Sequence, residues 1–298
     1  MSGLAAARYL KSHGWNCLVL DKGRSVGGRM ATRRIGESRL DHGAQFFTAR
    51  DAEFRNLVAQ WRQASLVDAW FEKDGEVCYR AAGGMNALAK HMAQELEVRT
   101  QVTVASVEPG PAGWRVVSTS GEQWNTARVL LTAPLPQSAA LLGEHSEMLP
   151  PLPEANYEPC FALLAVLTGG GLLPPEGFVQ LEVGPVAWIA DNTHKGISSG
   201  PAALTIHASA RFSQEHFDFP QEQVAALLLQ AASPWLGSPV AEWQLHRWRY
   251  ARPACRMPQL FAEAQHPAPL LVLGDTFGGP RVEGACLSGI AAARRLAG

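Results

Sequence analysis

The start of the chain carries an order of elements that few folds accommodate. Residues 1–10 are rich in alanine and leucine and predict a helix, and Cys17-Leu18-Val19-Leu20 predicts a short buried strand that ends at Asp21. In a dinucleotide-binding βαβ unit, the third glycine of G-x-G-x-x-G opens the helix, and an acidic residue follows about 20 positions further on. Asp21 follows Gly3 by eighteen positions. The pattern therefore predicts the second half of such a unit, with Asp21 placed to accept the hydroxyls of an adenosine ribose.

The first half of that unit is missing from the sequence. Only Met1 and Ser2 precede Gly3, so the strand and the first two glycines of the motif are absent. This strand is central in a doubly wound sheet and leads into the turn that holds the pyrophosphate. We therefore interpret the chain as N-terminally truncated and expect it to fold poorly or to bind its nucleotide weakly. Taken alone, the half-motif is also compatible with an ordinary N-terminal helix followed by a surface acid.

A glycine- and arginine-rich segment follows Asp21 directly. Residues 22–34 predict a loop in which Gly27-Gly28 lets backbone approach a ligand and Arg29 offers a planar fork to a pyrophosphate. Residues 40–48 then place small residues beside an amide and two phenylalanines. That composition suits backbone lying against an isoalloxazine, the ring system of a flavin. A solvated basic loop is the alternative for residues 22–34.

The C-terminal part of the chain predicts a second contact with a flavin. Leu270-Leu271-Val272-Leu273 is a buried strand that runs into Gly274-Asp275, residues 276–284 predict a loop, and a helix of small residues follows from Ala285. A helix N-terminus offers free N–H groups and a partial positive charge, which stabilise the negative charge of a reduced flavin. We expect Asp275 to bond a ribityl hydroxyl and the backbone of Val282 to meet the pyrimidine edge. The alternative is an ordinary helix cap.

The rest of the chain predicts an α/β protein of two interleaved domains. Helices are expected at 51–64, 85–96 and 221–232, and strands at 98–107, 114–118, 128–131, 161–167, 186–190 and 203–208. The proline-rich residues 134–175 suggest a crossover between domains. We assign residues 1–50, 80–135 and 266–298 to a Rossmann-like FAD-binding domain without its first strand, and residues 51–79 and 136–265 to an α+β substrate-binding domain with an antiparallel sheet.

Composition excludes several other classes of protein. The formal net charge of -1 and the lack of a basic run give no support to a nucleic-acid partner. No apolar stretch approaches the roughly 20 residues of a membrane helix, so we expect no membrane association and a cytoplasmic location. The five cysteines are scattered without a C-x-x-C pair, which favours reduced thiols over disulfides or a metal site.

With these motifs in place, the chain resembles the renalase family of flavoproteins, and in particular its bacterial branch within the wider monoamine-oxidase-like group. The motifs that carry the resemblance run over nearly the whole chain: Asp21-Lys22, Gly27-Gly28-Arg29-Met30, Asp41, Gly43-Ala44-Gln45-Phe46-Phe47-Thr48, Gly83-Gly84-Met85, Trp248-Arg249-Tyr250, Gly274-Asp275 and Gly279-Pro280-Arg281-Val282-Glu283-Gly284-Ala285.

The resemblance implies FAD held without a covalent bond. By similarity, Ser2, Gln45 and Phe46 would touch FAD together with Arg29, and Val104 would contact the adenine. The motifs and the resemblance together give this set of expected FAD contacts: Ser2, Gly3, Asp21, Lys22, Gly28, Arg29, Met30, Gly43, Ala44, Gln45, Phe46, Val104, Gly274, Asp275, Arg281 and Val282.

The resemblance also implies an activity. Renalase-like enzymes oxidise the 1,2- and 1,6-dihydro isomers of NAD(P)H to NAD(P)+ and pass the electrons to oxygen, which gives hydrogen peroxide. Such a dihydropyridine needs only alignment with flavin N5, because loss of hydride restores aromaticity. This fits a sequence in which we find no catalytic triad, no metal cluster and no paired carboxylates, and in which no residue is assigned as catalytic with certainty.

Candidates for the substrate pocket come from the second domain. They are Trp188, Asn192, His246, Trp248 and Tyr250. Alternation along a strand puts the last three on one face, which suits stacking of a nicotinamide ring, although a core-lining aromatic strand explains the pattern equally well. His42 is either a residue that tunes the flavin or an ordinary packed or surface histidine.

Two other functions remain open at this stage. A true amine oxidase would use the same fold on a small amine, and a flavin-less binding protein descended from the enzyme would need no cofactor. A plain NAD-dependent dehydrogenase is disfavoured because it does not explain Gly274-Asp275. The expected partners are a small-molecule substrate, either a dihydropyridine nucleotide or an amine, and O2.

Overall fold

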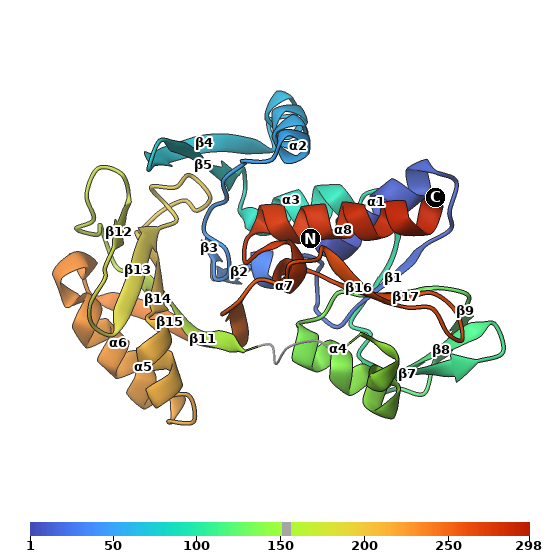
Figure 1. Ribbon diagram of the computed structural model, residues 1–298. Helices are drawn as coiled ribbons and strands as arrows, with labels where there is room; N and C mark the ends of the chain where they lie inside the picture. Colours follow the sequence, from blue (N-terminus) through green and yellow to red (C-terminus); the bar gives the residue numbers. More distant parts are fainter. Residues whose placement is uncertain (151–155) are drawn as a thin grey trace. The chain divides into compact units, whose positions relative to one another are not determined.

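The chain forms two compact units, and the computed structural model describes residues 1–150 and 156–298 (Figure 1). Unit 1 comprises Met1–Gly28, Ala89–Asn156 and Pro253–Gly298, and unit 2 comprises Arg29–Leu88 and Tyr157–Arg252. The two domains expected from the sequence divide the chain at other positions. Residues 29–50 and 80–88 lie in unit 2, and residues 136–150 and 253–265 lie in unit 1.

Unit 1 is a mixed α/β unit. Its helices are α1 (Ser2–Ser12), α4 (Leu135–Leu142), the 3-10 helix η2 (Gly143–Met148), α7 (Asp275–Gly278) and α8 (Val282–Ala297). Its strands are β1 (Leu18–Asp21), β6 (Glu97–Thr100), β7 (Val104–Gly110), β8 (Gly113–Ser118), β9 (Gln123–Thr126), β10 (Val129–Leu131), β16 (Phe261–Ala264) and β17 (Leu270–Leu273). Strands β7, β8 and β9 form an antiparallel meander.

The parallel strands of unit 1 fall into two separate sheets. β1 pairs with β6, while β10 pairs with β17, whose other edge is covered by antiparallel β16. The edges of β1 and β10 that face away from these partners have no strand beside them within the described residues. A Rossmann-like sheet without its central strand would leave such edges.

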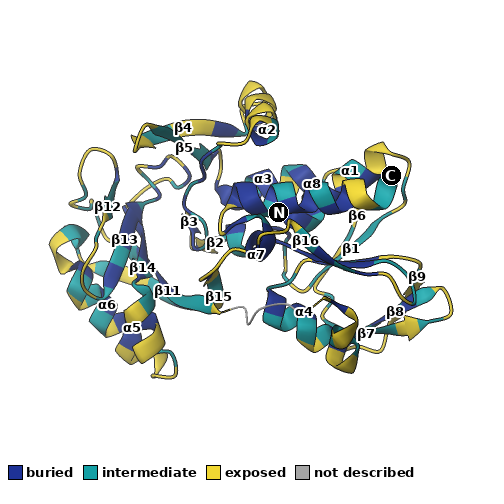
Figure 2. Ribbon diagram, in the orientation of Figure 1, coloured by how far each residue is buried: buried dark blue, intermediate teal, exposed yellow. Residues whose placement is uncertain are grey.

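Apolar packing joins the two sheets. Leu20 of β1 packs against the cluster that contains Val272 of β17, and Cys17 packs against the cluster that contains Leu271. All four residues of β17 are buried (Figure 2). Helices α1 and α8 run side by side over this strand (Figure 1). The sheet strand expected at 270–273 is confirmed, and it forms the centre of the core of unit 1.

Unit 2 contains the larger sheet. Its elements are the 3-10 helix η1 (Gly28–Met30, which begins at the unit boundary), β2 (Thr32–Ile35), β3 (Ser38–Asp41), α2 (Ala52–Gln63), β4 (Val67–Lys73), β5 (Glu76–Ala81), α3 (Met85–Ala93, which crosses into unit 1), β11 (Tyr157–Leu167), β12 (Phe178–Gln180), β13 (Val186–Asp191), β14 (Ala203–Ala208), α5 (Ala210–Glu215), α6 (Gln221–Leu236) and β15 (Val240–Pro253). The five-stranded sheet has the order β12-β13-β14-β11-β15, and β2-β3 and β4-β5 are hairpins.

The two faces of the five-stranded sheet pack against different partners. One face carries Leu163, Ile189 and Ile206 and is covered by α6. The other carries Leu164 and Ala203, which pack against the β2-β3 hairpin. Because directly paired residues in an antiparallel sheet point to the same side, Trp188 and its partner His207 also lie on the hairpin side. The segment that follows β3 therefore runs along this second face.

Several local expectations are confirmed. Helix α2 begins after Asp51, whose carboxylate accepts hydrogen bonds from the amides of Glu53 and Phe54, as expected for an N-cap. The helix expected at 221–232 is α6, and the strands at 186–190 and 203–208 are β13 and β14. No helix within the described residues has the length and hydropathy needed to cross a membrane.

Other local expectations are wrong. Residues 22–34 do not form only a loop, because Thr32–Ile35 pairs with β3. The strand expected at 98–107 is interrupted by Gln101, whose φ of 61° breaks the extended backbone. The expected crossover at 134–175 does contain the passage from unit 1 to unit 2, after Asn156. It is not irregular, however, because these residues include α4, η2 and β11; residues 151–155 lie outside the described residues.

Candidate functional site

In unit 1, the first turn of α1 lies against α8. A Cβ atom added to Gly289 would lie 2.2 Å from the carbonyl oxygen of Ser2, and one added to Gly274 would lie 4.0 Å from Ser2 Oγ. The N-terminus of α1 and the turn after β17 are therefore neighbours, as expected if the two ends of the chain serve one ligand. A helix N-terminus in this position presents free N–H groups and the positive end of a dipole.

Asp21 stands at the carboxyl end of β1, as the half-motif predicted. It is half-buried, its Oδ1 accepts a hydrogen bond of 2.7 Å from the amide of Gly23, and its backbone oxygen accepts one from Val102. The hydrogen bond from the amide of Gly23 turns the chain sharply after the strand. Lys22 beside it is exposed. Val104, the expected adenine contact, is half-buried at the start of β7 in the same unit.

The turn after β17 is held by a serine that sequence reasoning missed. The amide of Gly274 donates to Ser288 Oγ at 2.9 Å, and that hydroxyl donates to the carbonyl of Leu260 at 2.6 Å. Gly274 has a φ of 143°, a conformation that favours glycine. Ser288 gave no signal in the sequence beyond being one polar residue in a helix of small residues. Asp275 follows directly and is buried.

The loop expected at 276–284 is wrong in part. Asp275–Gly278 forms the short helix α7, and α8 begins at Val282, not at Ala285. Glycine is required here because a Cβ atom on Gly278 would lie 1.7 Å from the carbonyl oxygen of Gly284. The earlier start places buried Val282 in the first turn of α8, preceded by exposed Arg281. Its backbone is thus part of the helix N-terminus that we expected at Ala285.

In unit 2, the segment from Asp41 to Phe46 is built around a close backbone contact. The amide of Ala44 donates to the carbonyl of Arg29 at 2.8 Å, and a Cβ atom on Gly43 would lie 2.0 Å from that oxygen. Only glycine fits at position 43. Nη1 of Arg29 donates to the carbonyls of Tyr250 and Ala251 at 3.3 Å each, so part of the guanidinium is used to hold β15. Met30 beside it is buried.

Gln45 folds back on its own segment. Its Nε2 donates to the carbonyls of Asp41 at 2.6 Å and Gly43 at 3.1 Å. Its Oε1 is buried and has no hydrogen-bond partner within the described residues. A buried acceptor without a donor costs about 1–3 kcal/mol, so this oxygen is suited to an N–H of a bound group.

An aromatic cluster lies at the β12–β13 end of the sheet. The ring of Phe46 lies 5.5 Å from Trp188 and 5.0 Å from Phe71, and Phe178 stacks on Trp188 at 4.6 Å. Nε1 of Trp188 is buried and lacks a hydrogen-bond partner within the described residues. The flat, apolar surface of this cluster can contact a planar ring.

A second cluster, of histidines and one tryptophan, lies at the β14–β15 end. The ring of His42 stacks on Trp248 at 5.3 Å and meets His246 edge-on at 5.0 Å. The indole N–H of Trp248 donates to the carbonyl of His42 at 2.8 Å, and His207 Nε2 lies 3.3 Å from the same oxygen. Nδ1 of His42 is buried without a hydrogen-bond partner in the described part of the chain.

The five expected pocket residues do not form one group. His246 and Trp248 lie together on β15, whereas Trp188 lies on β13, which β14 and β11 separate from β15. Tyr250 packs edge-on against Tyr157 at 5.4 Å. Asn192 is 0% exposed, and both ends of its amide bond protein groups, including the amide of Asp41 at 3.1 Å. Asn192 holds the segment after β3 in this arrangement.

Buried His42 and half-buried His207 both resist protonation. Burial, followed by the charges of His246, Arg33 and His207, lowers the pKa of His42 to about 3. Burial likewise lowers the pKa of His207 to about 4. Desolvation disfavours the charged imidazolium. Both rings are therefore neutral at physiological pH.

These pKa shifts predict a loss of stability on mild acidification. The unfolded chain takes up protons on both histidines below about pH 6.5, while the folded protein does not until pH falls to about 4 or 3. The free energy of unfolding therefore decreases by up to about 1.4 kcal/mol per pH unit for each histidine in this interval. Urea denaturation at a series of pH values between roughly 7 and 5 measures the slope.

The matched variants are His42→Gln and His207→Gln, with exposed His13→Gln as control. Each buried-site variant is expected to flatten the pH dependence, and the control is expected to leave it unchanged. Identical slopes in all four proteins would contradict the proposed burial of neutral rings.

Comparison with known proteins places this chain in a family. Residues 63–297 match the family model described as flavin containing amine oxidoreductase, and residues 1–61 match that of an NAD(P)-binding Rossmann-like domain. The chain belongs to the flavin-containing amine oxidoreductase family. It is 25% identical to renalase of Mus musculus over 261 residues, which cover 78% of this chain and 76% of that protein. The expected wider amine-oxidase-like group and the α/β fold are confirmed.

Solved structures share the fold at low sequence identity. A putative protoporphyrinogen oxidase from Exiguobacterium sp. 255-15 superposes with a TM-score of 0.75 at 12% identity, over 99% of this chain and 96% of that one. A triple mutant of putrescine oxidase superposes with a TM-score of 0.70 at 16% identity, with the same coverage. The protein is accordingly an FAD-dependent oxidoreductase of the amine oxidase family that acts on a small molecule.

Proposed function

We propose that the protein oxidises the 1,2- and 1,6-dihydro isomers of NAD(P)H to NAD(P)+. Bound FAD would accept a hydride from the substrate, and O2 would take up the two electrons with two protons as H2O2. The proposal is supported by the similarity to mouse renalase and by the motifs from Asp21 to Ala285 that resemble that family.

The FAD contacts are part of this proposal, and the residues present fit the cofactor. In unit 1, Ser2, Gly3, Asp21, Gly274 and the first turn of α8 supply what a dinucleotide needs, namely a helix N-terminus, a ribose-type acid and glycine where backbone must come close. Lys22, Gly28, Val104, Asp275, Arg281 and Val282 complete the set in this unit. Bound FAD supplies the hydride-accepting ring, and the protein's residues supply orientation.

In unit 2, we assign the segment Gly43–Phe46 to the flavin, together with Arg29 and Met30. The unpaired Oε1 of Gln45 supports this assignment, because it can accept a hydrogen bond from an N–H of the ring. Gly43 supports it as well, since the tight contact with Arg29 fixes the backbone of the segment. A fixed backbone can orient a flat ring without spending entropy at the moment of binding.

The observation that carries the choice of substrate is the positive charge beside the His42–Trp248 cluster. Arg33 Nη1 donates to Gln244 Oε1 of β15 at 3.2 Å. After burial, its charge is among the causes that lower the pKa of His42 and His246. A positive potential disfavours an ammonium substrate and favours a dinucleotide with anionic phosphates. The face of Trp248 is suited to stack the neutral dihydropyridine ring.

A small amine is the second candidate substrate. The family to which the chain belongs supports it, as does the aromatic cluster of Phe46, Phe71, Phe178 and Trp188. Aromatic faces attract cations, and a cluster of this kind can hold an ammonium group. This site would lie at the other end of the sheet from Trp248.

The two candidates are separated by anaerobic titration of the FAD-loaded protein. We expect each dihydro isomer to bleach the flavin absorbance at one equivalent and putrescine to leave it unchanged. Trp248→Ala is expected to raise the KM for the dihydro isomers at least tenfold, and Trp124→Ala in the meander of unit 1 serves as control. Bleaching by amines alone would overturn the proposal and favour the aromatic cluster around Trp188.

A further inference from the structure

We propose that Lys195 is a positioning residue that sets the flavin-binding properties of the segment Asp41–Phe46. The inference rests on the proposed assignment of Gly43–Phe46 to the flavin. It concerns a residue that carries no motif in the sequence and lies outside the expected site.

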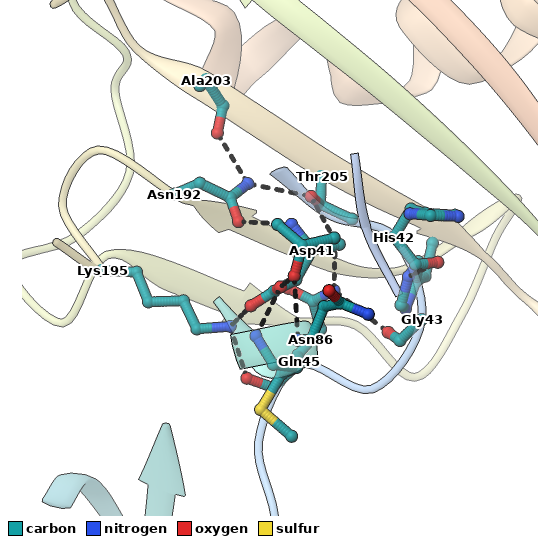
Figure 3. A network of polar contacts seen from close by, with 12 residues as sticks. Asp41, His42, Gly43, Gln45, Asn86, Asn192, Lys195, Ala203 and Thr205 are labelled. Atoms are coloured by element: carbon teal, nitrogen blue, oxygen red, sulfur yellow. Dashed lines mark hydrogen bonds and ion pairs between the residues drawn. The ribbon is translucent and has the colours of Figure 1, made fainter. Parts of the chain in front are cut away.

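The ammonium group of Lys195 holds both ends of this segment. Nζ lies 2.7 Å from Asp41 Oδ2 and donates to the backbone carbonyl of Gln45 at 2.5 Å (Figure 3). The side chains of Lys195 and Asp41 are both 0% exposed. The ammonium also lies 4.9 Å from the ring of Trp70, which provides a cation–π contact. One buried cation therefore fixes the side chain that begins the segment and the backbone near its end.

Asp41 is held from several directions. Its Oδ1 accepts hydrogen bonds from Thr32 Oγ1 at 2.5 Å and from the amide of Met85 at 2.8 Å. Its amide donates to Asn192 and its carbonyl accepts from Thr205, both on the five-stranded sheet side (Figure 3). These contacts fix the orientation of the carboxylate independently of Lys195. Lys195 then links this fixed carboxylate to the backbone carbonyl of Gln45.

Gln45 closes the arrangement into a ring. Its Nε2 donates to the carbonyl of Asp41, while its own carbonyl accepts from Lys195 (Figure 3). The segment between them contains Gly43, whose backbone contacts Arg29. Rotation of the peptide at Gln45 would break the contact with Lys195. The ammonium consequently determines how the backbone and the Oε1 of Gln45 face a bound flavin.

A buried ion pair is a poor device for stability alone. Removing two charges from water is costly, and well-packed apolar side chains of similar volume often serve stability as well or better. An ammonium that donates to two oxygens instead fixes the orientation of the groups that carry those oxygens. Dispersion contacts have no such directionality. Holding a binding site to a narrow geometry depends on such supporting hydrogen bonds.

The decisive variant removes both charges and keeps the shape. Lys195→Met/Asp41→Asn leaves no unpaired buried charge, and the asparagine retains an acceptor for Thr32 and Met85. The matched control is Arg252→Met/Glu158→Gln, which neutralises a more exposed ion pair in the same unit. The readouts are the denaturation midpoint of the protein without FAD, the Kd for FAD, and the visible spectrum and midpoint potential of the bound flavin.

We expect the double variant to unfold at the same midpoint as its control, to bind FAD at least tenfold more weakly, and to show an altered flavin spectrum. A folded double variant with native Kd, spectrum and potential would overturn the proposal and leave Lys195 with a structural role. If the double variant does not fold, Lys195→Arg is the test, because the guanidinium keeps the charge but directs its donors differently. Native FAD properties in that variant would equally overturn the proposal.

A separate variant distinguishes this proposal from the assignment on which it rests. Gln45→Ala keeps the Lys195–Asp41 pair and the backbone carbonyl at position 45, but removes Oε1. If Gly43–Phe46 contacts the flavin, this variant changes the spectrum of bound FAD, whatever the substrate. An unchanged spectrum in Gln45→Ala would overturn the assignment itself, whereas an unchanged spectrum only in the Lys195 variants would overturn the role of Lys195.

Discussion

Replacing Gly289 with alanine is expected to lower the free energy of unfolding by about 1–3 kcal/mol and to weaken FAD binding. The new Cβ atom would lie 2.2 Å from the carbonyl oxygen of Ser2 and 3.0 Å from its carbonyl carbon. Backbone atoms cannot move aside as a flexible side chain can, so α1 must shift away from α8. Ser2 and Gly3, two proposed FAD contacts, would move with it.

The test is informative because two effects predict opposite signs for the change in stability. Gly289 lies inside α8, and helix propensity alone predicts that alanine stabilises the helix by about 1 kcal/mol. The steric contact predicts the opposite sign. Denaturant unfolding and FAD titration of Gly289→Ala decide between them, with Gly170→Ala as control because a Cβ atom there would meet nothing within 4 Å. A stabilised variant with native FAD affinity would show that α1 does not pack on α8 as described.

Replacing Trp114 with alanine is expected to cost about 3–5 kcal/mol of stability. The side chain is 0% exposed, packs within the cluster around Leu270 and Val272, and donates its indole N–H to the carbonyl of Ala268 at 2.9 Å. Its loss would leave both a cavity and an unpaired carbonyl under the sheet that carries the Gly274 turn. Thermal and urea unfolding measure the effect.

Trp124 provides the matched control in the neighbouring strand. It lies on β9, which pairs with β8, the strand that carries Trp114. Its side chain is only partly buried, and the guanidinium carbon of Arg99 lies 6.0 Å from its ring centre. Trp124→Ala is therefore expected to cost clearly less than Trp114→Ala, because less apolar surface returns to water. Equal losses in the two variants would contradict the burial of Trp114 described here.

The motifs at the two ends of the chain were readable because they depend on local chemistry. Gly3 stands in the first turn of a helix, while Asp21 and Gly274 stand where a strand ends, and the residue types that such places require follow from backbone geometry and helix ends. The β2-β3 and β4-β5 hairpins were not expected, since their short strands lack a clean apolar alternation. Their pairing depends on the partner strand rather than on their own pattern.

Sequence alone predicted the FAD cofactor, the wider amine-oxidase-like group and a shared ligand for the two chain ends, because these predictions depend on short patterns whose chemistry is fixed within a few neighbouring residues. The role of Lys195 emerged only from the tertiary structure: in the sequence it is one lysine in a polar turn, and its partner Asp41 lies 154 positions away. Whether a charged side chain is buried depends on what distant segments place around it, and no local pattern records that.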